Sequence, residues 1–191
     1  MKQALTHLLF SLIAFSITYG IALLTSLQII QQAVLYIFLI QWLLFIPAYL
    51  FQTEKFYDLT GSVTYLLAVT YVSIQSYSEA NTNMGNLILA AFIILWAIRL
   101  GSFLFIRIHK SGEDKRFRLI KPSFTRFFMT WTLQGMWVSI CSMCALTAIA
   151  SEKGVIQNVF FYLGAFIFLS GFSIPIITSS IDLCKSSYVI P

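Results

Sequence analysis

The sequence predicts an all-α fold, a polytopic transmembrane helical bundle of about six spans. Three observations predict it: 59% of the 191 residues are hydrophobic, only 10% are charged, and the apolar residues occur in long runs. A soluble domain carries about 25% charged residues, whereas a bilayer span needs about 20 predominantly apolar residues in succession. Because backbone groups inside lipid must satisfy their hydrogen bonds within the segment, the spans are expected to be helices.

The predicted spans cover residues 5–27, 33–51, 61–77, 85–108, 127–150 and 155–177, all within a single membrane domain over residues 1–191. The first apolar stretch is too long for the core of a signal peptide, and we interpret it as a retained span. The third span is the shortest and the most polar. The fourth contains a formal charge, Arg99.

The distribution of Lys and Arg predicts the orientation. The basic loop at residues 107–126 holds seven of the twelve basic residues, and such loops stay on the cytoplasmic side. Counting back through four spans places the N-terminus, with Lys2, on the same side. Lys55 and Lys185 then also lie on the cytoplasmic side, whereas Lys153 lies on the outer side. We therefore predict a multi-pass membrane protein with a cytoplasmic N-terminus and a cytoplasmic basic loop.

Charge and cysteine usage argue against several classes of protein. The net charge of +5 resides at span ends and in one loop, which is typical of membrane orientation and not of nucleic-acid binding. Cys141 and Cys144 share a helix face, but their span offers no His or acid to complete a metal site, so we expect packing and no metal. The sequence contains no phosphate-binding glycine loop or nucleophile elbow.

A first candidate for chemistry lies between the second and third spans, where Tyr57 and Asp58 stand at a membrane boundary. A tyrosine there could donate a proton to a substrate oxygen while a carboxylate orients it. The alternative is a solvated loop in which Asp58 or Thr60 caps the third helix.

A second candidate is the end of the fourth span. Arg99 precedes Arg107 by eight residues, about 12 Å along a helix, which is too deep for an ordinary anchor and predicts a polar partner or a wet cavity. The basic residues that follow either touch anionic headgroups or bind an anionic ligand such as a nucleotide phosphate. The adjacent acids Glu113 and Asp114 favour the second interpretation, since they can order the loop by pairing with its arginines.

Two strings carry a resemblance to a known family: Phe56-Tyr57-Asp58-Leu59-Thr60-Gly61-Ser62-Val63-Thr64, and Trp96-Ala97-Ile98-Arg99-Leu100-Gly101 followed by Arg107 and Gly112-Glu113-Asp114-Lys115-Arg116-Phe117. They resemble the bacterial steroid 5-alpha-reductase-like membrane family, formerly a domain of unknown function. That family is similar to steroid 5-alpha-reductases, sterol reductases and isoprenylcysteine methyltransferases. The resemblance runs from about residue 34 to residue 171.

The resemblance implies an NADPH-dependent reductase of C=C bonds in a lipid-soluble, steroid-like enone. It also implies that the protein lies in the bacterial inner (cytoplasmic) membrane. It implies a lipid-bilayer environment and a hydrophobic small-molecule substrate, whose identity it leaves open along with the oligomeric state. It places Arg99, Arg107, Glu113, Asp114 and Arg116 on the cofactor side and Tyr57 and Asp58 on the substrate side.

The C-terminus departs from the family. Relatives continue with acids after the sixth span, an Arg-His-Pro-type segment and a further helix that supply much of the nucleotide site. Here Pro175 and Ser179 stand about where acids are expected. We therefore expect a C-terminally truncated chain with an incomplete NADPH site. A non-enzymatic membrane protein (a degenerate remnant, a lipid-binding protein or an assembly partner) is the alternative hypothesis. A transporter ranks lower, because ion pathways place several ionisable groups within the membrane.

Overall fold

The computed structural model describes residues 2–78 and 83–187, with side chains described for residues 2–77 and 83–173. The described residues form six long helices and one short 3₁₀ helix, with no strand, which confirms the predicted all-α fold. The elements are α1 (Lys2–Leu24), α2 (Gln28–Leu50), α3 (Tyr57–Ser78), α4 (Met84–Ser111), η1 (Lys115–Phe117), α5 (Phe124–Ala150) and α6 (Val159–Ser187).

The helices α1, α2, α4 and α5 are long and apolar enough to cross a membrane, judged by length and composition over the described residues. Helix α3 has 22 residues, but Asp58 and a series of Ser, Thr and Tyr side chains make it more polar. Its crossing of the bilayer therefore stays a prediction, as does the total of six spans. The described side chains are consistent with a membrane protein, because many large apolar side chains of α1, α2 and α4 are exposed.

The chain divides into two compact units, Met1–Val155 and Ile156–Pro191. The first unit holds α1–α5 and every residue predicted to form a site. The second unit holds α6. Asn158 directly precedes this helix, and its Oδ1 accepts a hydrogen bond from the Phe161 N–H at 3.1 Å and thereby caps the first turn. Helix α6 continues to Ser187, ten residues beyond the predicted end of the sixth span.

The turn between α1 and α2 is shorter than the sequence predicts. Residues 28–32 were expected to form an outer loop, but α2 begins at Gln28. Ser26, with φ of 55°, reverses the chain, and the Thr25 hydroxyl donates to the Ala22 carbonyl at 2.7 Å. Glutamine is compatible with a helix, and one of the glutamines, Gln32, has a polar partner: its Oε1 accepts from the Tyr71 hydroxyl at 2.6 Å.

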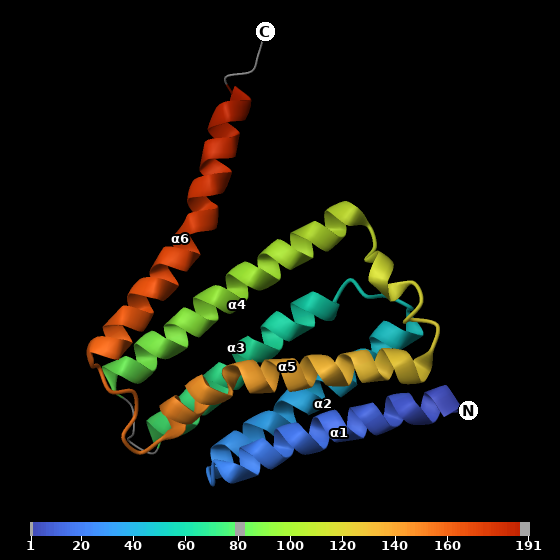
Figure 1. The fold of residues 1–191 in the computed structure, drawn as a ribbon, viewed down its shortest axis with the longest axis horizontal. Helices are drawn as coiled ribbons and strands as arrows, with labels where there is room; N and C mark the ends of the chain where they lie inside the picture. Colours follow the sequence, from blue (N-terminus) through green and yellow to red (C-terminus); the bar gives the residue numbers. More distant parts are fainter. Residues whose placement is uncertain (1, 79–82, 188–191) are drawn as a thin grey trace. The chain divides into compact units, whose positions relative to one another are not determined.

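Helix α5 is the centre of the first unit, since it packs against α1, α2 and α3, while α3 also packs along α4 (Figure 1). The main core contains buried residues of α2, α3 and α5, including Phe38, Val69 and Leu146. A second, aromatic core contains Phe127 and Trp131 together with other residues at one end.

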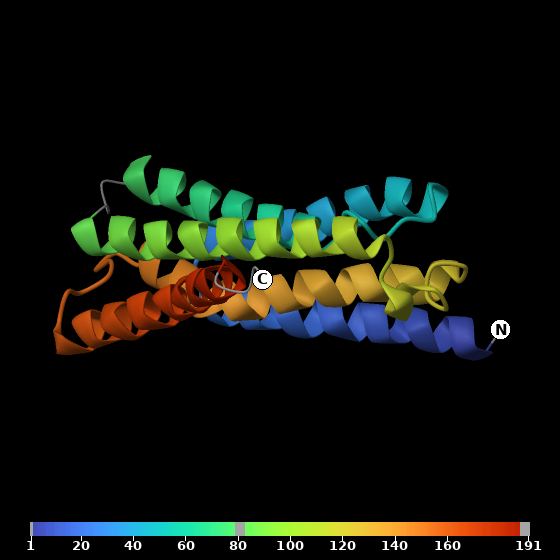
Figure 2. The ribbon, with the colours of Figure 1, turned by 90° about the horizontal axis from the view of Figure 1, so that it is seen from above.

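That end of the first unit carries all the predicted site residues except Arg99. The N-terminus, the α2–α3 connection and the α4–α5 connection all lie there (Figures 1 and 2). We call it the basic end, because it carries nine of the twelve Lys and Arg residues and four acids, Glu54, Asp58, Glu113 and Asp114. The nine are Lys2, Lys55, Arg107, Lys110, Lys115, Arg116, Arg118, Lys121 and Arg126.

Candidate functional site

The α4–α5 connection begins with a sharp turn that aims the two adjacent acids at the rest of the basic end. Gly112, with φ of 77°, ends α4, and its N–H donates to the Ile108 carbonyl at 2.9 Å. This left-handed conformation favours glycine over other residues. Asp114 then caps η1 by accepting from the Arg116 N–H at 3.0 Å. The Gly112–Arg116 sequence therefore builds its own local geometry.

A buried carboxylate holds this connection against the α2–α3 connection. Glu54 is 5% exposed, and its Oε1 accepts a hydrogen bond from the Asp114 N–H at 2.9 Å. Its Oε2 accepts from the Lys121 ammonium at 2.5 Å. We call this arrangement the Glu54 clamp. The sequence analysis did not predict this role of Glu54. One signal was available: an acid in a short loop and a basic loop were both predicted at the same membrane boundary, where they could pair.

Four of the five predicted cofactor residues, all except Arg99, line one open pocket, which we call the charged pocket. It has a volume of about 650 Å³ and lies where α4 and η1 meet the start of α3. Its charged lining consists of Asp58, Arg107, Glu113, Asp114, Lys115 and Arg116, and its other lining residues are Leu104, Ile108 and Ser111. The volume is within the range of about 300–1,000 Å³ typical of small-molecule sites.

Ion pairs order the charged pocket. Arg116 forms a two-pronged pair with Asp114, with its Nε 3.0 Å from each carboxylate oxygen. Arg107 Nη2 lies 3.4 Å from Asp58 Oδ2 and joins α4 to α3. Glu113, which lines the pocket, pairs with Arg118, which does not. The arginine side chains remain largely open to solvent, with 49% exposure for Arg107 and 70% for Arg116.

The acids at this end differ in their electrostatics. Burial opposes ionisation of Glu54, but the hydrogen bonds from Lys121 and the Asp114 N–H outweigh burial and hold the pKa of Glu54 below its ordinary value. The Arg116 hydrogen bond likewise lowers the pKa of Asp114. Asp58, which precedes the predicted third span, behaves differently: burial raises its pKa in spite of the opposing charges of Arg107 and Arg116. Of these three carboxyl groups, Asp58 is the one whose pKa is raised.

Tyr57, one of the two predicted catalytic residues, lies beside the charged pocket and is not part of its lining. Its hydroxyl donates to the Thr130 carbonyl on α5 at 3.1 Å. Its ring packs edge-on against Phe117 and Trp131, at centroid distances of 5.0 and 5.4 Å. The structure thus brings Tyr57 close to the site but engages its phenol in a contact with the backbone.

Arg99 does not line the charged pocket. It lies on α4, half-buried, about 12 Å from Arg107 by helical rise. The structure therefore brings together five of the seven predicted residues, Asp58, Arg107, Glu113, Asp114 and Arg116, and leaves Tyr57 and Arg99 outside the pocket.

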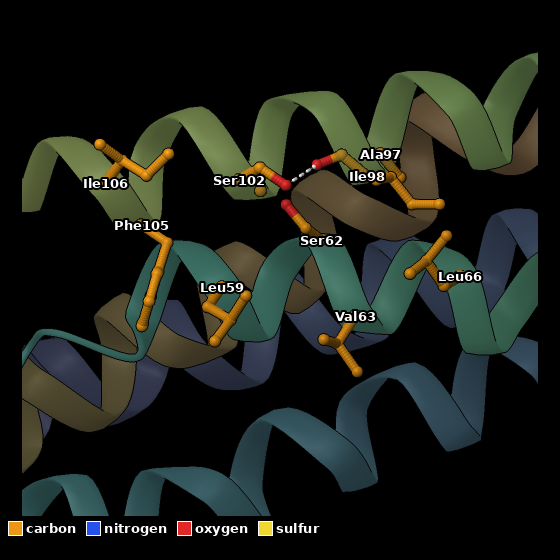
Figure 3. A pocket seen from close by; sticks show the side chains of 10 residues that line it. Leu59, Ser62, Val63, Leu66, Ala97, Ile98, Ser102, Phe105 and Ile106 are labelled. Carbon is orange, nitrogen blue, oxygen red and sulfur yellow. Dashed lines mark hydrogen bonds between the residues drawn. The ribbon is translucent and has the colours of Figure 1, made fainter.

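An apolar groove of about 450 Å³ runs between α3 and α4, closer to the middle of the two helices. Its lining includes Leu59, Val63, Leu66, Ile98, Phe105 and Ile106 (Figure 3). Two serine hydroxyls also reach it, and both donate within their own helices: Ser102 to the Ile98 carbonyl at 2.7 Å and Ser62 to the Asp58 carbonyl at 3.4 Å. Because a hydroxyl donates one hydrogen bond, the groove mainly offers hydrocarbon contact.

Over the described residues, no three His, Cys, Asp or Glu side chains gather in a group that could hold a metal ion.

Fold and site thus define a membrane-type helical protein with an ion-paired pocket at one end of its first unit. Residues 41–183 match the family model described as "Protein of unknown function (DUF1295)", and the chain belongs to this family. The match includes all seven predicted site residues. No curated protein and no solved structure matches the chain.

Proposed function

We propose that the protein is a membrane reductase-like protein whose charged pocket binds the phosphate groups of NADPH. The observation that carries this proposal is the convergence of five predicted residues from α3, α4 and the α4–α5 connection on one pocket. When bound, NADPH would supply the hydride that reduces a C=C bond. The apolar groove between α3 and α4 supports a lipid-soluble substrate, since its lining is mainly hydrocarbon.

The arginines have the donors that this role needs. A guanidinium carries five N–H donors, and the pair with Asp58 uses one N–H of Arg107. The remaining donors of Arg107 and the exposed side chain of Lys115 can approach a phosphate oxygen from the pocket. Planar guanidinium groups bind phosphate in a bidentate manner, which favours arginine at such a site.

Asp58 supports the acid side of the reaction. Its raised pKa favours a carboxyl group that holds a proton, and it lies in the charged pocket, one residue before Leu59 of the apolar groove. We assign to Asp58 the polarisation or protonation of a substrate carbonyl. We assign to Tyr57 a positioning role, because its hydroxyl already donates to the Thr130 carbonyl.

The test is NADPH binding to the purified full chain in lipid nanodiscs, measured by calorimetry. Arg116→Ala and Arg107→Ala should each weaken binding by about tenfold or more, since a charge-assisted hydrogen bond contributes about 1.5–3 kcal/mol. Arg99→Ala tests whether Arg99, which lies outside the charged pocket, contributes to NADPH binding. Lys153→Ala, at the opposite end of the first unit, serves as the control and should leave binding unchanged. Absence of NADPH binding, with the same assay positive on a longer relative, would remove the enzymatic proposal for this chain.

A second function, a non-enzymatic lipid-binding protein, is favoured by one observation. The charged lining holds three acids and three bases, so the pocket has no excess positive charge of its own. A dinucleotide with several negative charges gains less from such a pocket than a ligand with one phosphate. Binding of short-chain phospholipid without NADPH binding in the same calorimetric experiment would support this function.

A further inference from the structure

Large apolar side chains are exposed at the basic end, in the two connections and at the start of α5. Leu119 in the α4–α5 connection is 78% exposed, and Phe56 in the α2–α3 connection is 53% exposed. Phe124 in the first turn of α5 is also exposed, although its ring packs against Phe45 and Tyr49. Large apolar side chains exposed at one end of a protein commonly mark a surface that meets a partner or a membrane.

These side chains are exposed on an ordered framework. The Leu119 carbonyl accepts a hydrogen bond from Arg126 Nη1 at 3.4 Å, which joins this part of the connection to α5. Phe117, two residues earlier, is 5% exposed and packs into the aromatic core. The Glu54 clamp joins the same connection to the one that carries Phe56. The exposure of Leu119 is therefore a property of the folded surface.

Cationic side chains alternate with the apolar ones. Lys55 directly precedes Phe56, and Arg118 directly precedes Leu119. Both cations are exposed, and Arg118 also pairs with Glu113. The basic end as a whole has nine bases against four acids. Surfaces that alternate cations with large apolar residues bind the headgroup layer of anionic membranes, where the cations meet phosphates and the apolar side chains enter the acyl boundary.

The length of α4 places this surface at the correct depth. A helix of 28 residues is about 42 Å long. The hydrocarbon core is about 30 Å thick, and the bilayer with its headgroups about 40–45 Å. If α4 spans the membrane, its last turn and the connection that follows it lie at the level of the headgroups.

We propose that Lys55, Phe56, Arg118, Leu119 and Phe124 form an interfacial rim that inserts into an anionic phospholipid surface. Phe56, Leu119 and Phe124 enter the acyl boundary, while Lys55 and Arg118 bind lipid phosphates. The charged pocket then opens within the headgroup layer, so that an amphiphilic ligand reaches it from the plane of the membrane. This inference goes beyond NADPH binding and does not depend on it.

The depth of the rim is measured with a spin label. Leu119→Cys is labelled in a full-length chain that carries Cys141→Ser, Cys144→Ser and Cys184→Ser, reconstituted in phosphatidylcholine nanodiscs with and without phosphatidylglycerol. The label at position 119 should be accessible to oxygen and shielded from a water-soluble nickel chelate. A label at Lys115→Cys, four residues away and exposed, is the matched control and should be accessible to the chelate. Equal chelate accessibility at the two positions in both lipid mixtures would overturn the proposal.

Lipid selectivity tests the cations separately. The ratio of bound spin-labelled phosphatidylglycerol to phosphatidylcholine should fall by up to about fivefold for each cation removed in Lys55→Gln and Arg118→Gln, since each interfacial cation contributes about 1 kcal/mol. Lys153→Gln, at the opposite end, should leave the ratio unchanged. A ratio that stays the same in the double variant of Lys55 and Arg118 would show that the rim does not bind anionic lipid. Neither measurement uses NADPH, so failure here is distinguishable from failure of the proposed function.

Discussion

At the scale of single residues, Glu54 determines how the site is assembled. Its carboxylate is almost completely buried, yet it belongs to a short connection that is otherwise partly exposed. It satisfies a backbone N–H of Asp114 and the ammonium group of Lys121 at the same time. Removing one partner from a buried charged pair leaves the other without compensation, which costs more than the pair itself contributes. Glu54 is therefore a positioning residue for the charged pocket.

We predict that Glu54→Gln lowers the free energy of unfolding by about 1–3 kcal/mol. It should also increase cleavage of the α4–α5 connection in limited proteolysis, because glutamine has one acceptor oxygen and no charge and cannot bind both the Asp114 N–H and the Lys121 ammonium as the carboxylate does. Thermal unfolding in detergent, followed by circular dichroism, measures the first effect. Glu152→Gln, an exposed acid at the opposite end, is the control. Unchanged stability and unchanged proteolysis in Glu54→Gln would contradict the clamp.

The pH dependence of the same variant follows from the pKa of Glu54. Because folding lowers this pKa, the ionised carboxylate stabilises the fold above its unfolded pKa, and the contribution is lost as the pH falls through the folded pKa. The stability difference between the natural chain and Glu54→Gln should therefore be full at neutral pH and shrink below about pH 4. A stability difference between the two chains that grows as the pH falls would contradict the lowered pKa of Glu54.

At the scale of the elements, α3 and α4 approach each other closely where small residues meet. A Cβ atom on Gly101 would lie 2.7 Å from the Cβ of Ser62, closer than real side chains approach. This contact sets the spacing of the two helices that line the apolar groove and carry Asp58 and Arg107. The position of the charged pocket therefore depends on a packing contact between two residues that have no charge.

We predict that Gly101→Ala lowers the free energy of unfolding by about 1–3 kcal/mol, because the added methyl group forces α3 and α4 apart. The double variant Gly101→Ala with Ser62→Gly should recover part of this loss, since the Ser62 Cβ is the atom in conflict. Gly20→Ala on α1 is the matched control, because a Cβ there meets nothing within 4 Å. Thermal unfolding of the four chains gives the coupling between the two positions. Additive effects of the two substitutions would contradict the close contact.

At the scale of the whole molecule, the alternation of helices gathers segments that are far apart in the sequence. The first residues, the α2–α3 connection and the α4–α5 connection meet at the basic end of the first unit (Figure 1). The orientation of that end in the membrane is predicted from its bases. The charged pocket and the interfacial rim both belong to it, so its side of the membrane decides which ligands reach the site.

We predict that the basic end faces the cytoplasm. Single cysteines replacing Lys55 or Lys115, in a chain without its natural cysteines, should react with a membrane-impermeant maleimide only after the cells are permeabilised. A cysteine replacing Lys153 should react in intact cells. The opposite labelling pattern would invert the orientation, and labelling of Lys55 and Lys115 from different sides would contradict the path of α3 and α4 through the membrane.

The sequence alone predicted the all-α fold and about six spans, because long runs of apolar residues favour membrane helices whatever their neighbours are. Four of the helices in the structure are long and apolar enough to cross a membrane, judged over the described residues. It also predicted Asp58, Arg107, Glu113, Asp114 and Arg116 as candidate site residues, through a short motif and a family resemblance. Tertiary structure decided which candidates meet: Arg99 stays along α4, and the hydroxyl of Tyr57 is engaged by Thr130. It also revealed Glu54 and the contact of Gly101 with Ser62. The physical reason is the distance along the sequence over which each property acts. Hydropathy belongs to one segment, whereas a buried ion pair or a contact between helices joins residues that are far apart in the sequence and that only packing brings together.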